Sequence, residues 1–402
     1  MNFDYDVVIV GAGPIGSNLA YLLSKNNLSI CLIDKKKEIG IPLQCAGIVS
    51  KDILNYIDIP NDLIINKAKG AFLHTKNNIL QVNKEESTAL IIDRVLFDKY
   101  LFKKAIGEGV EFIQNKVINI DSEKGIVKCA NGDTISSKII VGADGVNSIV
   151  SKEINNDLNK VNASQFLVKI DDNGVNDFRN SKKNINEFVD VYVDSRIFPG
   201  FLWCIPTENN LYRVGLFSDE DYKSQNLILN EFLEENFTVN SYEIIEKYKG
   251  AIPKCNFKNK LYENRVLLIG DAAAQVKPTT GGGLVLGFNI SKYASKIITN
   301  SIINDDISLI KNYADEFKNK FFNELTSQYK LQKTLKILSN DDLDYLFKKL
   351  KENDAEELIS KYGDIDKQSI LIKEFFKRGL IFKVIPSLFI KNISSIWNYK
   401  FK

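Results

Sequence analysis

The chain has 402 residues, 44% of them hydrophobic, which is enough for two or three structural regions around a substantial core. Its 53 basic and 51 acidic side chains nearly balance, so a nucleic-acid partner is not expected, because phosphate-binding surfaces usually carry a large basic excess. The five cysteines form no CxxC pair and His74 is the one histidine, so we expect no metal site, no dithiol motif and no histidine relay. His74 itself is interpreted as a strand or surface residue.

The N-terminal segment 5–10 is apolar but far too short to cross a bilayer, and it runs directly into glycines. We interpret it as a buried strand and not as a signal peptide. No run of about twenty apolar residues occurs, so no transmembrane helix is expected. Because an odd number of cysteines fits a reducing compartment, we predict a cytoplasmic protein, either soluble or peripheral on the inner face of the cell membrane.

The order of the expected elements indicates an α/β fold. The chain opens as strand, glycine turn, helix and strand, and a similar pattern returns after a mixed-sheet region that is rich in aromatic residues. We therefore predict one Rossmann-type domain built from separated segments, with a mixed or antiparallel β-sheet domain inserted and a helical C-terminal region. The expected elements are residues 5–10, 17–25, 29–34, 89–106, 110–141, 156–254, 265–271, 282–300 and a helical remainder.

The first turn reads GAGPIG at positions 11–16. Gly11 permits the tight turn, Gly13 lets backbone approach a pyrophosphate, and Gly16 allows close packing of helix on strand. The following helix N-terminus offers unpaired N–H groups to phosphates, and Asp34 at the end of the second strand is placed to bond ribose hydroxyls. This context predicts a dinucleotide site.

Two later segments distinguish FAD from NAD. GDAA at 270–273 ends a strand, so Asp271 is expected where ligands bind in such sheets, in position to accept a hydrogen bond from a ribityl hydroxyl. PTTGGGL at 278–284 opens a helix, and its glycines let backbone N–H groups approach the pyrimidine edge of the flavin. A helix N-terminus there favours the negative charge of reduced flavin. FAD is therefore the predicted cofactor.

These motifs also carry a family resemblance. GAGPIG, Arg94 in IIDRVLFDKYL, GADGVNS at 142–148 and RVLLIGDAAA at 265–274 together resemble the p-hydroxybenzoate hydroxylase-type FAD fold. Within that fold the chain is most similar to the geranylgeranyl reductase family, especially its archaeal members that saturate isoprenoid membrane lipids. The sharper signals are IGIPLQCAG at 39–47 and PTTGGGL. The resemblance covers about the first 300 residues.

A third family signal lies at 199–206, which resembles the YxWxFP substrate motif of these reductases. Phe201 stands for the tyrosine and Ile205 for the phenylalanine, while Trp203 and Pro206 are kept. The resemblance implies Phe201, Trp203 and Pro206 as substrate-binding residues.

The resemblance places Arg94 against the ribityl or phosphate part of FAD, with a salt bridge to Asp93 or Asp98 as the structural alternative. It places Cys45 near the reactive face of the flavin, where a thiol donates a proton, stacks as an apolar group or forms an adduct; a buried inert cysteine is the alternative. Cys45 is the predicted catalytic residue. The predicted cofactor-binding residues are Gly11, Gly13, Pro14, Ile15, Gly16, Asp34, Lys35, Cys45, Ala46, Gly47, Arg94, Val117, Asp144, Gly270, Asp271, Gly282, Gly283 and Leu284.

The implied reaction is reduction of an isolated alkene in an isoprenoid lipid by a proton and a flavin hydride. Two departures disfavour an aromatic hydroxylase of the same fold, because Ala274 replaces the usual histidine and Ser151-Lys152 stand where arginine is usual. An FAD monooxygenase and an electron-transfer flavoprotein dehydrogenase stay as alternatives, although no Fe–S cysteine set supports the latter. No second GxGxxG stands out, so the electron donor is left open between reduced ferredoxin, a deazaflavin and transiently bound NADPH.

The predicted boundaries follow these motifs. The segment 377–402 mixes apolar residues with lysines, which suits membrane-surface contact through an interfacial segment and equally suits a helix packed on the protein. Because the implied substrate is a lipid, we favour membrane contact. The predicted domains are 1–60, 87–155 and 256–300 for FAD, 61–86 and 156–255 for substrate, and 301–402 for the helical region.

Overall fold

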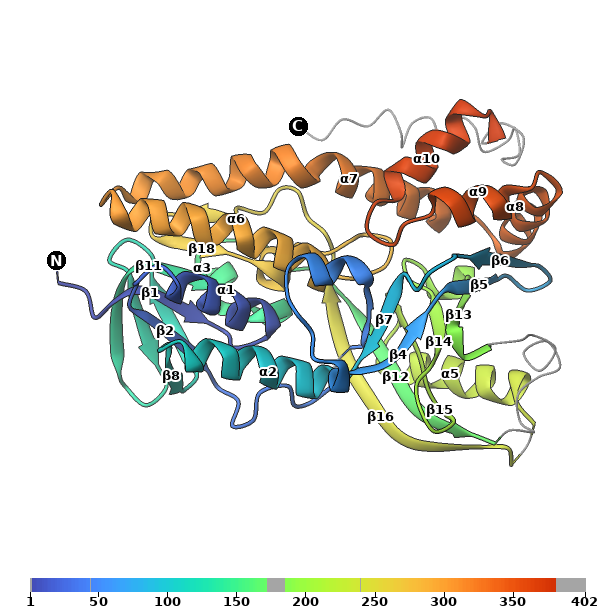
Figure 1. Cartoon of the computed structure of the whole chain (residues 1–402), viewed down its shortest axis with the longest axis horizontal. Helices are drawn as coiled ribbons and strands as arrows, with labels where there is room; N and C mark the ends of the chain where they lie inside the picture. Colours follow the sequence, from blue (N-terminus) through green and yellow to red (C-terminus); the bar gives the residue numbers. More distant parts are fainter. Residues whose placement is uncertain (1, 44, 172–184, 239, 381–402) are drawn as a thin grey trace.

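A computed structural model describes residues 2–43, 45–171, 185–238 and 240–380, which form two large sheets, one small sheet and a helical C-terminal region (Figure 1). In the described part of the chain, no helix is both long and apolar enough to span a bilayer. The strands are β1 Tyr5–Val10, β2 Ile30–Asp34, β3 Ile48–Ser50, β4 Ile64–Ala68, β5 Gly70–His74, β6 Ile79–Asn83, β7 Ala89–Ile92, β8 Glu111–Gln114, β9 Val117–Asp121, β10 Ile126–Cys129, β11 Thr134–Gly142, β12 Lys160–Ile170, β13 Phe188–Tyr192, β14 Leu202–Pro206, β15 Leu211–Ser218, β16 Tyr242–Pro253, β17 Tyr262–Glu263 and β18 Val266–Leu268. The α-helices are α1 Pro14–Ser24, α2 Arg94–Gly107, α3 Ile149–Glu153, α5 Tyr222–Asn236, α6 Leu284–Ile303, α7 Asn312–Lys336, α8 Asn340–Glu352, α9 Ala355–Tyr362 and α10 Gln368–Lys377.

The first sheet has the order β17-β18-β11-β1-β2-β8, and the pairs from β18 to β8 are parallel. Both faces of β1 are buried, which explains its unbroken apolar sequence. Val7 and Ile9 pack into the core under α1 and α6, while Val8 and Val10 pack into the core with β9, β10 and α3. Strands from three distant parts of the chain thus meet at one sheet, and their carboxyl ends form one edge.

The second sheet has the order β16-β12-β15-β14-β13-β5-β6 and is antiparallel except for the pair of β13 with β5. Its strands alternate between two environments. Leu202 and Cys204 of β14 pack toward α5, whereas Trp203 and Ile205 pack on the opposite face of the sheet. The strands of the small sheet β3-β7-β4 are interrupted in sequence by β5 and β6 of the second sheet, and β7 leads directly into α2.

The helices differ slightly from their predicted bounds, for a local reason. Helix α1 begins at Pro14 and not at residue 17, because Gly13 is the N-cap and proline is well suited to the first helical position. Helix α6 begins at Leu284, since the glycines before it form the preceding loop.

Helices α7 to α10 form the predicted helical C-terminal region. Figure 1 shows α6 and α7 running side by side along one edge of the molecule, with α8 to α10 beyond them over β5 and β6. Leu80 of β6 packs with Phe347, Leu350 and Ala355, and Glu356 accepts a hydrogen bond from the backbone N–H of Gln81 at 2.6 Å. The C-terminal helices are therefore docked on the second sheet. The predicted interfacial segment falls almost entirely in residues 381–402, outside the described residues.

Candidate cofactor and substrate site

A cavity of about 1210 Å³ lies between the two large sheets. Its walls come from the glycine turn before α1, the loop before β3, the start of α2, the loop before α6, the second sheet and the C-terminal helices. Many of the predicted site residues meet here. Those that line the cavity are Gly13, Pro14, Ile15, Cys45, Ala46, Arg94, Asp271, Gly282, Gly283, Leu284, Phe201 and Trp203.

The glycine turn has the close contacts that its sequence predicts. Gly11 has φ +108°, and a Cβ there would lie 2.4 Å from the carbonyl oxygen of Ala143. A Cβ at Gly16 would lie 2.0 Å from the carbonyl oxygen of Gly11, so helix and turn pack too tightly for any side chain. At Gly13 a Cβ would meet no atom within 4 Å, and this residue faces the cavity. The turn is closed on its protein side and open where a pyrophosphate would approach.

Two carboxylates hold the loops at this sheet edge. Asp34 accepts hydrogen bonds from the backbone N–H groups of Ala12 at 2.8 Å and Lys36 at 2.9 Å. Each oxygen keeps acceptor capacity that a ribose hydroxyl can use. Asp144 accepts from Ser148 Oγ at 2.5 Å and from the N–H of Ile149 at 2.7 Å, which orders the start of α3.

Several predicted cofactor residues lie beside the cavity without lining it. Lys35 is exposed, and its neighbour Lys36 lines the cavity instead. Val117 of β9 pairs with Cys129 of β10 and is buried in the core. The predicted cofactor residues outside the lining are Gly11, Gly16, Asp34, Lys35, Gly47, Val117, Asp144 and Gly270. The predicted substrate residue Pro206 also lies outside it.

Asp271 and the glycine loop form the opposite wall. Among the described residues, none donates a hydrogen bond to the Asp271 carboxylate, and burial raises its pKa to about 6 although Arg94 acts in the opposite direction. A Cβ at Gly283 would lie 3.1 Å from Asp271 Oδ1, so the loop passes close to this carboxylate. A carboxylate that lacks a donor in the described part of the chain, beside a closely approaching glycine loop, fits the hydroxyl-bearing ribityl chain of FAD.

Arg94 joins the cofactor side of the cavity to Cys45. Its guanidinium donates to Asp98 Oδ1 at 3.1 Å, within the same helix. The salt bridge expected as the alternative to a cofactor contact is therefore present, and Arg94 also lines the cavity. Burial disfavours the charged form of Arg94, but Asp98 and the adjacent Cys45 outweigh it and raise its pKa. Arg94 is therefore a permanent cation at the cavity wall.

Two residues that the sequence analysis missed hold the Cys45 loop. Arg213 of β15 is buried and donates through Nη1 to the carbonyl oxygens of Ala46 at 2.9 Å and Ile92 at 3.1 Å. A Cβ at Gly47 would lie 2.0 Å from this nitrogen, which explains the glycine. Burial lowers the pKa of Arg213, and Cys45 acts against that change. No local motif marks Arg213, because its partners lie more than a hundred residues away.

Gln165 of β12 is the second missed residue. Its Oε1 accepts from Trp203 Nε1 at 3.1 Å, and its Nε2 lies 3.5 Å from the carbonyl oxygen of Cys45. The side chain thus connects the predicted substrate residue to the predicted catalytic loop.

The part of the cavity that faces the second sheet and the C-terminal helices is mostly apolar. Phe201 makes edge-to-face contacts with Trp203 at 6.1 Å and with Phe217 at 5.2 Å between ring centroids. Ile205 lines the cavity, whereas Pro206, on the next position of the strand, does not. The C-terminal helices close this half, and the residues they contribute include Leu331, Leu335, Ile359, Ile365 and Leu371.

The fold and these loops define a flavoprotein oxidoreductase. Residues 4–319 match the family model described as FAD binding domain, and the chain belongs to this family. FAD is its cofactor, as the glycine turn and the Asp271 loop predict.

Comparison with individual proteins shows which group of flavoproteins the chain resembles. The chain is 30% identical over 397 residues to an uncharacterized protein of Methanocaldococcus jannaschii, covering 96% of this chain and 99% of that one. It is 29% identical over 423 residues to digeranylgeranylglycerophospholipid reductase 1 of Methanococcoides burtonii, covering 100% of this chain and 95% of that one. A geranylgeranyl bacteriochlorophyll reductase-like structure from Thermoplasma acidophilum superposes with a TM-score of 0.81 at 22% identity, covering 98% of this chain and 99% of that one. These findings confirm the predicted fold and the predicted resemblance to geranylgeranyl reductases.

Proposed function

We propose that the protein reduces the carbon–carbon double bonds of geranylgeranyl chains in membrane glycerophospholipids. The observation that carries this proposal is the junction, within one cavity, of the cofactor loops with a mostly apolar chamber lined by aromatic residues. Such a chamber suits a long hydrocarbon chain, because burial of apolar surface supplies its binding free energy. The names of the similar archaeal reductases support the same substrate class.

The residues of the chamber position the alkene and exclude water. Trp203 is 8% exposed, and its hydrogen bond to Gln165 fixes the ring. FAD held by the glycine turn and the Asp271 loop would, once reduced, supply the hydride for one alkene carbon. An isolated alkene has no carbonyl to accept charge, so positive charge builds on the more substituted carbon as a proton is added. Trp203 and Phe201 stabilise that charge by cation–π attraction, worth about 1–2 kcal/mol in a desolvated site.

We propose Cys45 as the proton donor to the other alkene carbon. Its thiol lies in the cavity wall and interacts with the guanidinium groups of Arg94 and Arg213. Adjacent positive charges stabilise the thiolate that remains after proton transfer. Arg94 and Arg213 therefore act through Cys45 as positioning residues.

The reducing equivalents come from an external donor, for which we propose reduced ferredoxin, a deazaflavin or transiently bound NADPH. We further propose that the protein works on the cytoplasmic face of the membrane, from which a lipid chain enters the cavity. The apolar, lysine-containing segment that follows α10 is the candidate membrane contact.

The test of the reaction is anaerobic. The purified FAD-loaded protein is reduced with dithionite, mixed with a geranylgeranylated glycerophospholipid, and the product masses are recorded. The expected result is a gain of two hydrogens for each reduced double bond, with reoxidation of the flavin. A control without dithionite should leave the lipid unchanged.

An unchanged lipid in the reduced sample contradicts the proposal. If the reduced flavin then consumes oxygen and hydroxylates an aromatic compound, the protein is a monooxygenase. If it only passes electrons to a quinone, it is an electron-transfer flavoprotein.

A further inference from the structure

A second cavity, of about 360 Å³, adjoins the first. The two share Phe217, Ile252, Lys277 and Gly281 in their linings, so a thin wall separates them. The second cavity is bounded by the end of β15, the residues after β16, the loop before α6, and α7. Its volume lies at the lower end of the range of small-molecule sites.

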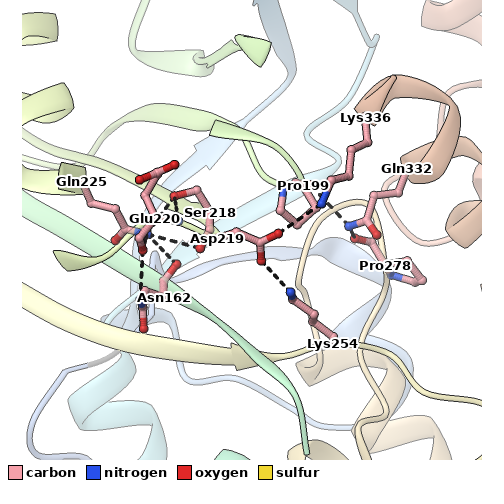
Figure 2. Close-up of polar contacts among 10 residues, drawn as sticks. All are labelled: Asn162, Pro199, Ser218, Asp219, Glu220, Gln225, Lys254, Pro278, Gln332 and Lys336. Atoms are coloured by element: carbon pink, nitrogen blue, oxygen red, sulfur yellow. Dashed lines mark hydrogen bonds and ion pairs between the residues drawn. The ribbon is translucent and has the colours of Figure 1, made fainter. Parts of the chain in front are cut away.

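The lining of this second cavity is basic. Four lysines line it, namely Lys254, Lys277, Lys333 and Lys336, together with the carboxylate of Asp219. Lys277 is paired with Asp366, so the other three ammonium groups share one lining carboxylate. Lys254 Nζ lies 2.6 Å from Asp219 Oδ1, and Lys336 Nζ lies 3.2 Å from Asp219 Oδ2. Figure 2 shows Asp219 between these two lysines. One carboxylate thus bridges two cations and leaves an excess of positive charge.

Buried glutamine contacts hold the acidic side of the cavity in place. Gln225 is fully buried, and its Nε2 donates to Ser218 Oγ at 3.0 Å and to the carbonyl oxygen of Glu220 at 3.3 Å (Figure 2). The same group donates to the carbonyl oxygen of Asn162 at 2.9 Å. Hydrogen bonds from Gln225 therefore hold the residues on both sides of Asp219 against β12 and α5.

A second glutamine holds the basic side. Gln332 of α7 donates to the carbonyl oxygen of Pro278 and to that of Pro199 at 3.3 Å (Figure 2). These contacts fix the helix that carries Lys333 and Lys336 against the loop before α6. The ammonium groups of Lys254 and Lys336 keep N–H groups beyond their contacts with Asp219. The ammonium of Lys333 lies 5.3 Å from the centroid of the Tyr329 ring.

We propose that this second cavity binds the phosphate of the lipid head group while an isoprenoid chain occupies the large cavity. The proposal rests on the proposed function, because it assigns the polar end of the same substrate. A phosphate diester carries the charge that Lys254, Lys333 and Lys336 attract, and it replaces or joins Asp219 between the ammonium groups. Because Phe217, Ile252 and Gly281 line both cavities, a head group in the second cavity lies next to the apolar chamber.

The kinetic test uses the FAD-loaded, dithionite-reduced enzyme with two substrates, a geranylgeranylated glycerophospholipid and the matching geranylgeranylated glycerol without phosphate. In the double variant Lys254→Gln/Lys336→Gln, KM for the phospholipid should rise roughly tenfold to a hundredfold, with kcat and the neutral lipid unaffected. Asp219→Asn should change KM in the opposite direction, because it removes the competing carboxylate. Lys320→Gln is the control, since Lys320 lies on the same helix but lines neither cavity.

The outcomes separate the two proposals. If neither lipid is reduced by the parent enzyme, the proposed function fails, and calorimetric titration of glycerol phosphate against the same variants then tests the site by itself. Equal effects on both lipids would show a structural role for the lysines and overturn the head-group proposal. Binding of inorganic phosphate as strong as that of glycerol phosphate, with phospholipid KM unchanged in the lysine variant, would assign the cavity to free phosphate and overturn it as well.

Discussion

At the scale of single residues, Asp271 is a carboxylate whose protonation is altered by burial. Its folded-state pKa of about 6 lies above the ordinary 3.8, chiefly because burial disfavours the charged form. Between these values the folded protein without FAD binds more protons than the unfolded chain. The contribution of protonated Asp271 to the stability of the folded state is therefore complete below about pH 4 and is lost as the pH rises through 6.

We expect Asp271→Asn to remove this dependence. In urea titrations of the FAD-free protein, stability of the wild type should fall between pH 4 and pH 7 by at most about 3 kcal/mol more than that of the variant, and less to the extent that solvent in the cavity screens the charge. Hydroxyl donors from bound FAD favour the ionised form, so wild-type FAD affinity should rise over the same pH interval. If the stability of the wild type and that of the variant changed with pH in parallel, the raised pKa would not belong to Asp271.

Cys45 is the residue on which the proposed chemistry depends. Because a positioned general acid contributes about 100-fold or more, Cys45→Ala should slow alkene reduction by at least that factor with normal flavin content. The rate is measured from flavin reoxidation by the lipid in a stopped-flow instrument. Cys129→Ala, at the buried end of β10, serves as the control. Full alkene reduction by Cys45→Ala would rule out the thiol as proton donor.

At the scale of elements, the turn between β1 and α1 separates packing from ligand approach. Gly16 faces the backbone of Gly11, whereas Gly13 faces the open cavity. A glycine-to-alanine substitution is therefore expected to affect packing at Gly16 and ligand approach at Gly13.

Gly16→Ala should destabilise the FAD-free protein by about 1–3 kcal/mol, because the added methyl group overlaps backbone that cannot move independently. Gly13→Ala should leave the unfolding midpoint nearly unchanged and weaken FAD binding, because its methyl group occupies space that the pyrophosphate needs. Thermal unfolding and fluorescence titration with FAD measure the two effects. Tight FAD binding by Gly13→Ala would place the pyrophosphate elsewhere.

At the scale of the whole molecule, the loop before α6 is joined to the C-terminal helices by a buried ion pair. Lys277 Nζ lies 2.5 Å from Asp366 Oδ1, with exposed fractions of 8% and 12%, and also donates to the carbonyl oxygen of Ile365 at 3.2 Å. Gln328 of α7 donates to the carbonyl oxygen of Asp366 at 3.2 Å. The cofactor loop and the helices that close the apolar chamber are thus held together.

Removing one partner of this pair leaves an uncompensated buried charge. Lys277→Gln should therefore destabilise the docking of residues 355–377 by about 3–5 kcal/mol, seen as faster hydrogen exchange in α9 and α10. The double variant Lys277→Met/Asp366→Leu should recover much of the protection, because neither charge remains. Unchanged exchange in the single variant would mean that the apolar contacts of the helices hold this region alone.

The sequence was informative wherever one local segment carries the whole signal. The glycine turn, Asp34 and the Asp271 loop each combine spacing with a strand or helix boundary, so their positions at the sheet edge could be predicted. The alternation along β14 was harder to use, since the family motif names Pro206 while the fold turns Ile205 toward the cavity. The domain boundaries and the role of Cys45 stay predictions.

The sequence by itself determined the α/β class and the cofactor, and it predicted the loops proposed to hold FAD, because these depend on hydrophobic periodicity and on glycines at fixed offsets. Only the tertiary structure decided which residues complete the site. Arg213 and Gln165 reach the Cys45 loop across more than a hundred residues, and the C-terminal helices, which carry no motif, close the apolar chamber. Such contacts are set by how sheets and helices pack, and packing partners far apart in sequence leave no local pattern.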